Sequence, residues 1–180
     1  MTRSKGNTRF CALVGMVLLL YGCAIPTKRS TVTFLLPEGF QGSVVVLYGQ
    51  EAGSDPRVED DSYVFDVPEN GVLRVTANAS EVPGQPRFLY VDGTGSRREI
   101  EVLVAFDPTG VKRTSRDISD EERAKTVFVF AFEHGSFKTS QGDVQFANFI
   151  VGHDIDGNYQ YTQMQKKLTE LQRSLSISAH

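Results

Sequence analysis

Cysteine is scarce in this 180-residue sequence, and both copies lie near its start. Cys11 falls inside an apolar N-terminal stretch, and Cys23 follows directly after that stretch. Cleavage before Cys23 would remove Cys11, and modification of the Cys23 thiol would leave no free thiol. We therefore expect no disulfide, thiol nucleophile, zinc–thiolate site or iron–sulfur cluster in the mature chain, and the residues suggest no other cofactor.

Basic charge is also limited, because 19 Lys and Arg residues stand against 22 Asp and Glu residues. Three of the basic residues and none of the acidic ones precede Cys23, so the remaining chain has a net charge of −6. A mildly acidic chain gains little from binding a polyanion. The charge balance thus argues against a nucleic-acid partner and against electrostatic adhesion to anionic lipid headgroups.

The N-terminal apolar run spans 12 residues, 10–21, and is well below the roughly 20 that a membrane-spanning helix needs. It follows the basic residues Arg3, Lys5 and Arg9, and it ends in Leu20-Tyr21-Gly22-Cys23. That ending resembles the bacterial lipobox. The pattern predicts a lipoprotein signal peptide over residues 1–22, with a lipidated Cys23 and a short tether over residues 23–30. An ordinary cleaved signal peptide with an incidental cysteine is the alternative.

Lipidation at Cys23 predicts a protein of the bacterial cell envelope that is held at a membrane. A diacylglyceryl group supplies two acyl chains, which meets the two-signal requirement for stable anchoring. Ala24 stands where an aspartate commonly signals retention in the inner membrane. By that resemblance to envelope lipoproteins, we expect the outer membrane, with the folded domain facing the periplasm.

Short alternating segments predict a mainly β domain over residues 31–153. Val44–Tyr48 is apolar on both faces, which is typical of a central strand that is covered on each side. Phe128, Phe130 and Phe132 alternate and are expected to share one face. The expected strands cover residues 31–36, 44–48, 63–67, 72–77, 88–91, 100–106, 126–133 and 144–151. About eight short strands predict a β-sandwich of transthyretin- or immunoglobulin-like type.

Two helices are expected. Ser119 and Glu122 form a capping-box pattern, which predicts a short helix over residues 120–125. The tail over residues 154–180 changes to a helical period and predicts an amphipathic helix that begins near Asp156 or Asn158. Its apolar stripe is Tyr161, Met164, Leu168, Leu171 and Leu175, and its expected solvent side includes Lys166, Lys167 and Arg173. The stripe either packs on the domain or forms a docking surface for a partner or a second copy.

Several segments carry a family resemblance. They are Phe34-Leu35-Leu36-Pro37-Glu38-Gly39-Phe40-Gln41-Gly42, Val67-Pro68-Glu69-Asn70-Gly71-Val72-Leu73-Arg74, Tyr90-Val91-Asp92-Gly93 with Gly95 and Arg97, and Phe146-Ala147-Asn148-Phe149-Ile150-Val151-Gly152. In this order they resemble a bacterial family of secreted and lipoprotein domains of unknown function. Pro-Glu-Gly-aromatic-x-Gly is the most specific piece. The resemblance implies a compartment and a fold but no catalytic residue.

His153, Asp154 and Asp156 are the candidate cation ligands in the sequence. Their spacing does not match an EF-hand loop, because the glycine follows the second carboxylate directly and no glutamate completes the loop. We therefore interpret the segment as a polar turn and expect no metal site. The acidic run Glu59-Asp60-Asp61 reads as a solvated loop, and Gly93-Thr94-Gly95 reads as a hairpin turn.

The function predicted first is a non-catalytic, membrane-anchored binding or interaction module whose partner is another envelope protein. No Gly-x-Ser-x-Gly elbow and no Ser-x-x-Lys motif is present in the sequence. A lipid-anchored hydrolase or metal-dependent enzyme is the second hypothesis. A carrier with an apolar cavity for a small ligand is the third, and the shape and lining of any cavity would separate the three.

Overall fold

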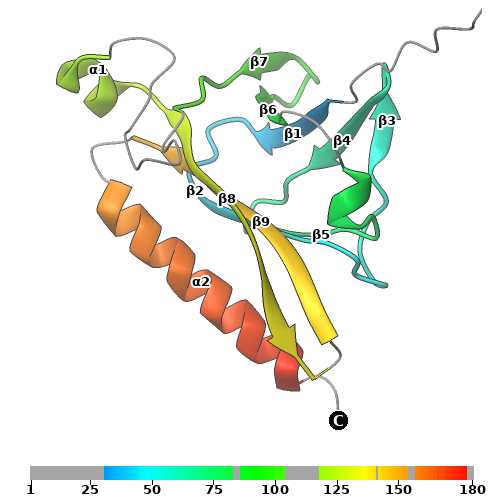
Figure 1. The fold of residues 1–180 in the computed structure, drawn as a ribbon. Helices are drawn as coiled ribbons and strands as arrows, with labels where there is room; N and C mark the ends of the chain where they lie inside the picture. The colour runs from blue at the N-terminus through cyan, green and yellow to red at the C-terminus, as the bar shows by residue number, and fades with distance from the viewer. Residues whose placement is uncertain (1–30, 83–85, 104–117, 141, 154–156, 178–180) are drawn as a thin grey trace, which may run out of the picture.

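A computed structural model describes residues 31–82, 86–103, 118–140, 142–153 and 157–177. These residues form a mainly β structure of two sheets with a long C-terminal helix (Figure 1), which confirms the general fold class expected from the sequence. No helix in the described part of the chain is long and apolar enough to span a membrane.

The first sheet, sheet A, has five strands and the second, sheet B, has four. Sheet A has the order β3 (Arg57–Glu59), β4 (Ser62–Asp66), β1 (Val32–Pro37), β6 (Pro86–Val91) and β7 (Arg97–Glu99). Sheet B has the order β5 (Val72–Arg74), β2 (Gly42–Leu47), β9 (Gly142–Gly152) and β8 (Phe128–Thr139). The helices are the 3₁₀ turn η1 (Ala79–Glu81), α1 (Asp120–Lys125) and α2 (Gly157–Ile177).

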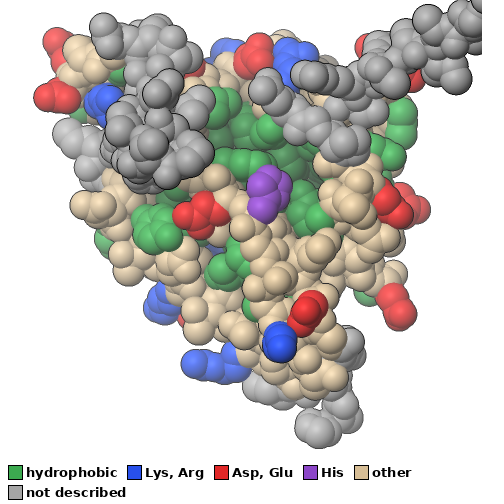
Figure 2. Space-filling model, viewed as in Figure 1, with side chains coloured by type: hydrophobic (Ala, Val, Ile, Leu, Met, Phe, Trp, Pro, Cys, Tyr) green, Lys and Arg blue, Asp and Glu red, His purple; other side chains and the backbone are tan. Residues whose placement is uncertain are grey.

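Sheet B is the middle layer of the molecule, with sheet A on one face and α2 on the other (Figure 1). Its strand β2 is therefore buried on both sides, as the apolar run from Val44 predicts: Val44 to Leu47 have no exposed surface. The core between the two sheets is aromatic, and Phe149 of β9 packs against Phe34 and Phe88 of sheet A. In Figure 2, hydrophobic side chains gather where the sheets face each other, and most of the charged side chains lie toward the margin.

A β-bulge divides the phenylalanines of β8 between two cores. Phe128 and Phe130 pack with Met164 under α2, but Phe132 packs in the core between the sheets. The pairing of β8 with β9 shifts register between Phe130 and Glu133, and Ala131 there has a φ of 53°. The extra residue turns the rest of the strand over. The expectation that Phe128, Phe130 and Phe132 share one face is therefore wrong.

The strand expected over residues 100–106, of which 104–106 lie outside the described residues, is placed too late in the sequence. The strand that pairs with β6 is β7, Arg97–Glu99, and Val102 instead makes an isolated bridge to Val129 of sheet B. Residues 101–103 thus connect the two sheets at the outer edge of β8. The short strand β3 was not expected. The helix α1 is confirmed, and the Ser119 side chain accepts a hydrogen bond from the Glu122 N–H as its cap.

Lys167 is half-buried rather than on the solvent side of α2. Its Nζ donates hydrogen bonds to the carbonyl oxygens of Ser43, at 2.8 Å, and Asn70, at 3.0 Å. These bonds connect α2 to the start of β2 and to the turn at Gly71, whose φ of 66° and close approach to the Ser43 carbonyl leave no room for a Cβ. Burial lowers the pKa of Lys167.

Lys167→Ala is expected to destabilise the domain by about 1–3 kcal/mol, because the carbonyl of the buried Ser43 and that of the exposed Asn70 lose a charged donor. The neighbouring exposed Lys166 provides the matched control, and Lys166→Ala is expected to change the free energy of unfolding by less than about 0.5 kcal/mol. Urea unfolding of the two variants measures both values. Equal midpoints would contradict the structural role given to Lys167.

Candidate functional site

A groove opens where sheet B divides. β2 follows β9 as far as Tyr48, whose N–H donates to the Gln145 carbonyl at 3.0 Å. The chain then turns away from β9. The Gly49 N–H donates to the Ala77 carbonyl, and the Gln50 N–H donates to the Val75 carbonyl. Because β9 continues without β2 to Gly142, the β8–β9 hairpin projects from the sheet as a separate wall (Figure 1).

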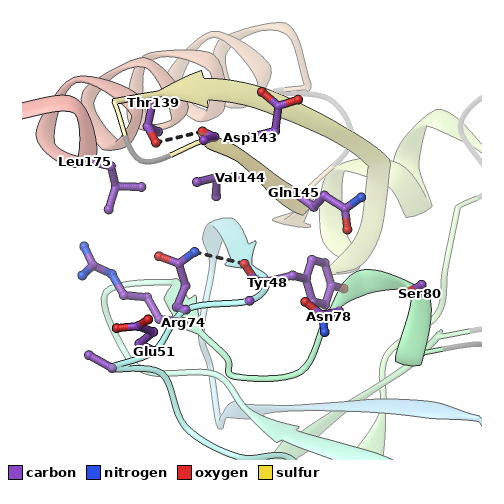
Figure 3. Close-up of a pocket in the computed structure, with 14 residues that line it drawn as sticks. Tyr48, Glu51, Arg74, Asn78, Ser80, Thr139, Asp143, Val144, Gln145 and Leu175 are labelled. Atoms are coloured by element: carbon purple, nitrogen blue, oxygen red, sulfur yellow. Dashed lines mark hydrogen bonds between the residues drawn. The ribbon is translucent and has the colours of Figure 1, made fainter. Parts of the chain in front are cut away.

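The groove has a volume of about 800 Å³, within the range of small-molecule and cofactor sites. One wall is the hairpin end together with the last turns of α2, and the other is the segment after β2 with β5 and η1 (Figure 3). The Ser140 side chain donates to the Ser176 carbonyl at 3.3 Å, which holds the hairpin against α2. The lining residues are Tyr48, Gly49, Gln50, Glu51, Ala52, Arg74, Asn78, Ser80, Thr139, Gly142, Asp143, Val144, Gln145 and Leu175.

The chemistry of this lining is mainly that of hydrogen bonding. Amides come from Gln50, Asn78 and Gln145, and hydroxyls come from Tyr48 and Ser80. In Figure 3 the carboxylate of Asp143 points away from the opposite wall, whereas Val144 and Leu175 lie toward the groove and supply an apolar portion. The charges that remain in the groove are those of Glu51 and Arg74, both on the lower wall in Figure 3.

Tyr48 lines the groove and is only 6% exposed. Its burial raises the pKa of the phenol to about 12. The phenol therefore stays protonated at neutral pH.

Tyr48→Phe is expected to reduce the fall in the free energy of unfolding between about pH 9 and about pH 12. Above pH 10 the unfolded chain loses this proton, whereas the folded chain holds it up to about pH 12, so the free energy of unfolding falls with rising pH. The difference between the folded and unfolded pKa of Tyr48 contributes about 2–3 kcal/mol to the stability of the wild type, and this contribution is missing in the variant. Urea unfolding at about pH 9 and about pH 12 measures it, and an equal difference between the two proteins at both pH values would contradict the burial of the phenol.

The groove does not coincide with the residues singled out in the sequence. His153 follows directly after β9 and its Nδ1 contacts the Thr126 carbonyl at 3.1 Å, while Asp154 and Asp156 lie outside the described residues, as does Cys23. The residues that the structure describes contain no group of three or more side chains placed to hold a metal ion. Gly157 begins α2, so Asn158 lies inside the helix and does not cap it.

The acidic run, expected as a solvated loop, begins at Glu59, the last residue of β3, and continues into a tight hairpin turn at the exposed residues Asp60 and Asp61. Asp60 and Asp61 have φ values of 48° and 60° and connect β3 to β4. Glu59 accepts two hydrogen bonds from Arg97, at 2.7 and 3.1 Å, although β3 and β7 are opposite edges of sheet A. These bonds lower the pKa of Glu59. The pair shows that sheet A curls strongly. Leu35, Val64 and Leu89 of this sheet form a small apolar cluster of their own.

These features define a mainly β, two-sheet domain with a C-terminal helix and a polar groove. The chain belongs to a family of unknown function, DUF6843, whose model matches residues 28–160. This confirms the resemblance to a family without an assigned activity. No curated protein matches the chain.

One solved structure with a similar arrangement is the 2.75 Å crystal structure named "Putative Lipoprotein from Bacillus anthracis". The two chains have 17% sequence identity and a TM-score of 0.46, over 68% of this chain and 71% of that one.

Proposed function

We propose that this protein is a lipid-anchored binding module of the bacterial cell envelope and that its groove holds a ligand without transforming it. The observation that carries the proposal is the groove itself, with its amides, its hydroxyls and a small apolar portion. Its lining has no histidine, cysteine or lysine among the described residues, and Tyr48 keeps its proton. These properties favour recognition over proton transfer or nucleophilic attack.

The sequence supports the anchored part of the proposal. Cys23 closes a lipobox-like ending, and Ala24 favours the outer membrane with the domain in the periplasm. The predicted tether leads into β1, which lies at the top of the molecule in Figure 1, whereas the hairpin that forms the groove points to the bottom. The tether would then present the groove away from the membrane surface. A transthyretin- or immunoglobulin-like relationship of the two sheets is part of the same proposal.

Cys23→Ser is expected to move the protein from the membrane fraction to the soluble fraction, or to leave the precursor uncleaved, because the substituted residue cannot carry the lipid. Membrane fractionation with immunodetection and mass measurement of the mature N-terminus check this. Cys11→Ser is the matched control and should leave both properties unchanged. Membrane partition and maturation that are the same in wild type and Cys23→Ser would refute the anchor.

A further inference from the structure

The groove exposes the backbone edge of a β-strand. Tyr48 donates its N–H to the Gln145 carbonyl, but the Tyr48 carbonyl accepts from the Gln50 side chain, at 3.0 Å. Among the described residues, the Gln145 N–H has no return bond to Tyr48. Tyr48 and Gln145 therefore form one of the two backbone hydrogen bonds of a ladder pair, and the ladder between β2 and β9 ends there.

The strand alternation shows which backbone groups are left over. In an antiparallel ladder, every second residue directs both its N–H and its C=O to the same neighbour. Since Gln145 faces the β2 side, Asp143 faces that side as well, beyond the point where β2 has turned away. The N–H of Gln145 and both backbone groups of Asp143 therefore border the groove at the spacing of a β-ladder. Asp143 contributes its backbone here and not its carboxylate (Figure 3).

The outer edge of the same hairpin is built differently. β8 carries the bulge at Ala131 and the charged residues Glu133 and Lys138, and Val129 near its start is bridged by residues 101–103. Bulges, charges and covering segments are the means by which natural sheets prevent pairing at an edge. Among the described residues, the inner edge of β9 has no bulge and no covering segment along Asp143–Gln145, and it lies inside a groove with two walls. The charged residue of this stretch, Asp143, directs its carboxylate away from the opposite wall (Figure 3).

From this geometry we infer that the groove binds an extended polypeptide segment, which adds to β9 as a strand. This inference rests on the proposed binding function and names its ligand class. Strand addition takes its affinity from the main-chain bonds and its specificity from pockets for alternate side chains. Here one face of the added strand meets Gln145 and Asn78, and the other meets Val144 and Leu175. The segment is expected to alternate polar and apolar residues.

The test begins with a random dodecapeptide display library, selected on the full chain in detergent micelles. The variant for counter-selection is Ala52→Trp, which places an indole in the groove. The matched control variant is Val58→Trp, which places the same side chain on the exposed strand β3. Enriched peptides are expected to bind wild type and Val58→Trp equally and Ala52→Trp at least tenfold more weakly. Their sequences should alternate between polar and apolar residues. Thermal melts confirm that both variants are folded.

The strand mode itself is tested on the tightest peptide by backbone N-methylation. Methylation of alternate residues on the edge that faces β9 is expected to weaken binding at least tenfold, whereas methylation on the other edge should change it less than threefold. Hydrogen exchange should slow at the Asp143 and Gln145 amides when the peptide binds. Equal effects of the two methylation patterns, or no protection of these amides, would overturn strand addition.

A second probe distinguishes a wrong ligand class from a wrong assignment of the groove as the binding site. The second probe is an N-acetylglucosamine oligomer, followed by amide shifts of Gln50, Asn78 and Gln145. In one outcome, selection on wild type enriches no peptide relative to selection on Ala52→Trp, while the oligomer changes the amide chemical shifts of the three residues. In that case the peptide inference is wrong and the binding function stands. If neither probe engages the groove in wild type, the peptide inference and the assignment of the groove as the binding site are both overturned.

Discussion

Phe149→Ala is expected to lower the free energy of unfolding by about 3–5 kcal/mol, the cost typical of removing a buried aromatic ring. Phe149 is completely buried between the sheets, with its ring centroid 5.2 Å from that of Phe34 and 4.7 Å from that of Phe88. A single domain has only about 5–15 kcal/mol of net stability, so this loss brings the protein close to unfolding. Denaturant unfolding followed by circular dichroism gives the value.

The exposed Val58 supplies the comparison for Phe149, since its side chain is 67% exposed on β3. Val58→Ala should change stability by less than about 0.5 kcal/mol. A loss below about 1 kcal/mol for Phe149→Ala would show that the two sheets do not share the core described here.

Met164→Ala is expected to cost about 2–5 kcal/mol, because it combines lost transfer free energy with a cavity under α2. Met164 has no exposed surface and packs on Phe128, Phe130 and Ile150 of sheet B. The result decides between the two meanings of the apolar stripe in the sequence, a stripe that stabilises its own domain and a docking surface for another chain. Urea unfolding of the variant is the measurement.

Tyr159 lies on the opposite side of the same helix and is 69% exposed, so Tyr159→Ala should leave the unfolding midpoint nearly unchanged. If Met164→Ala also leaves the midpoint in place but abolishes dimerisation or partner capture, α2 serves as an interface and does not belong to the domain core. The other members of the stripe are less buried: Leu168, Leu171 and Leu175 are intermediate and Tyr161 is exposed.

Elements whose signal is local could be predicted from the sequence. The doubly apolar run from Val44 gives a strand covered on both faces, and the residues of β9 divide as expected, with Ile150 toward α2 and Phe149 toward sheet A. The Asp92–Gly95 turn connects β6 to β7, and the Asp92 carboxylate accepts from the Thr94 and Ser96 N–H groups. Each of these features depends on neighbouring residues, which the sequence displays directly.

The errors arise where a distant contact overrides the local pattern. Phe132 changes face because Ala131 takes a left-handed conformation. A glycine at this position would have indicated that conformation, and the sequence has an alanine there. β7 is a charged strand, Arg97–Glu99, so the alternating apolar segment after it gave the stronger signal. Lys167 is drawn inward by two carbonyls that lie 124 and 97 residues away in the sequence.

The groove could not be found from the sequence, for two reasons. Its walls come from four separated places, represented by Tyr48, Asn78, Gln145 and Leu175, and no spacing connects them. Its distinctive groups are also backbone atoms of β9, which every residue possesses and no motif marks. The transthyretin- or immunoglobulin-like topology, the outer-membrane location and the absence of catalysis stay predictions.

Photo-crosslinking in intact cells tests the central claim, that the groove is the surface with which the anchored protein binds its ligand. A benzophenone amino acid replaces Val144 in the groove or Val58 on β3 in the anchored chain. We predict a defined adduct from position 144 that disappears when Ala52→Trp is added, and no such adduct from position 58. Absence of an adduct at position 144, or the same adducts from both positions, would contradict the account.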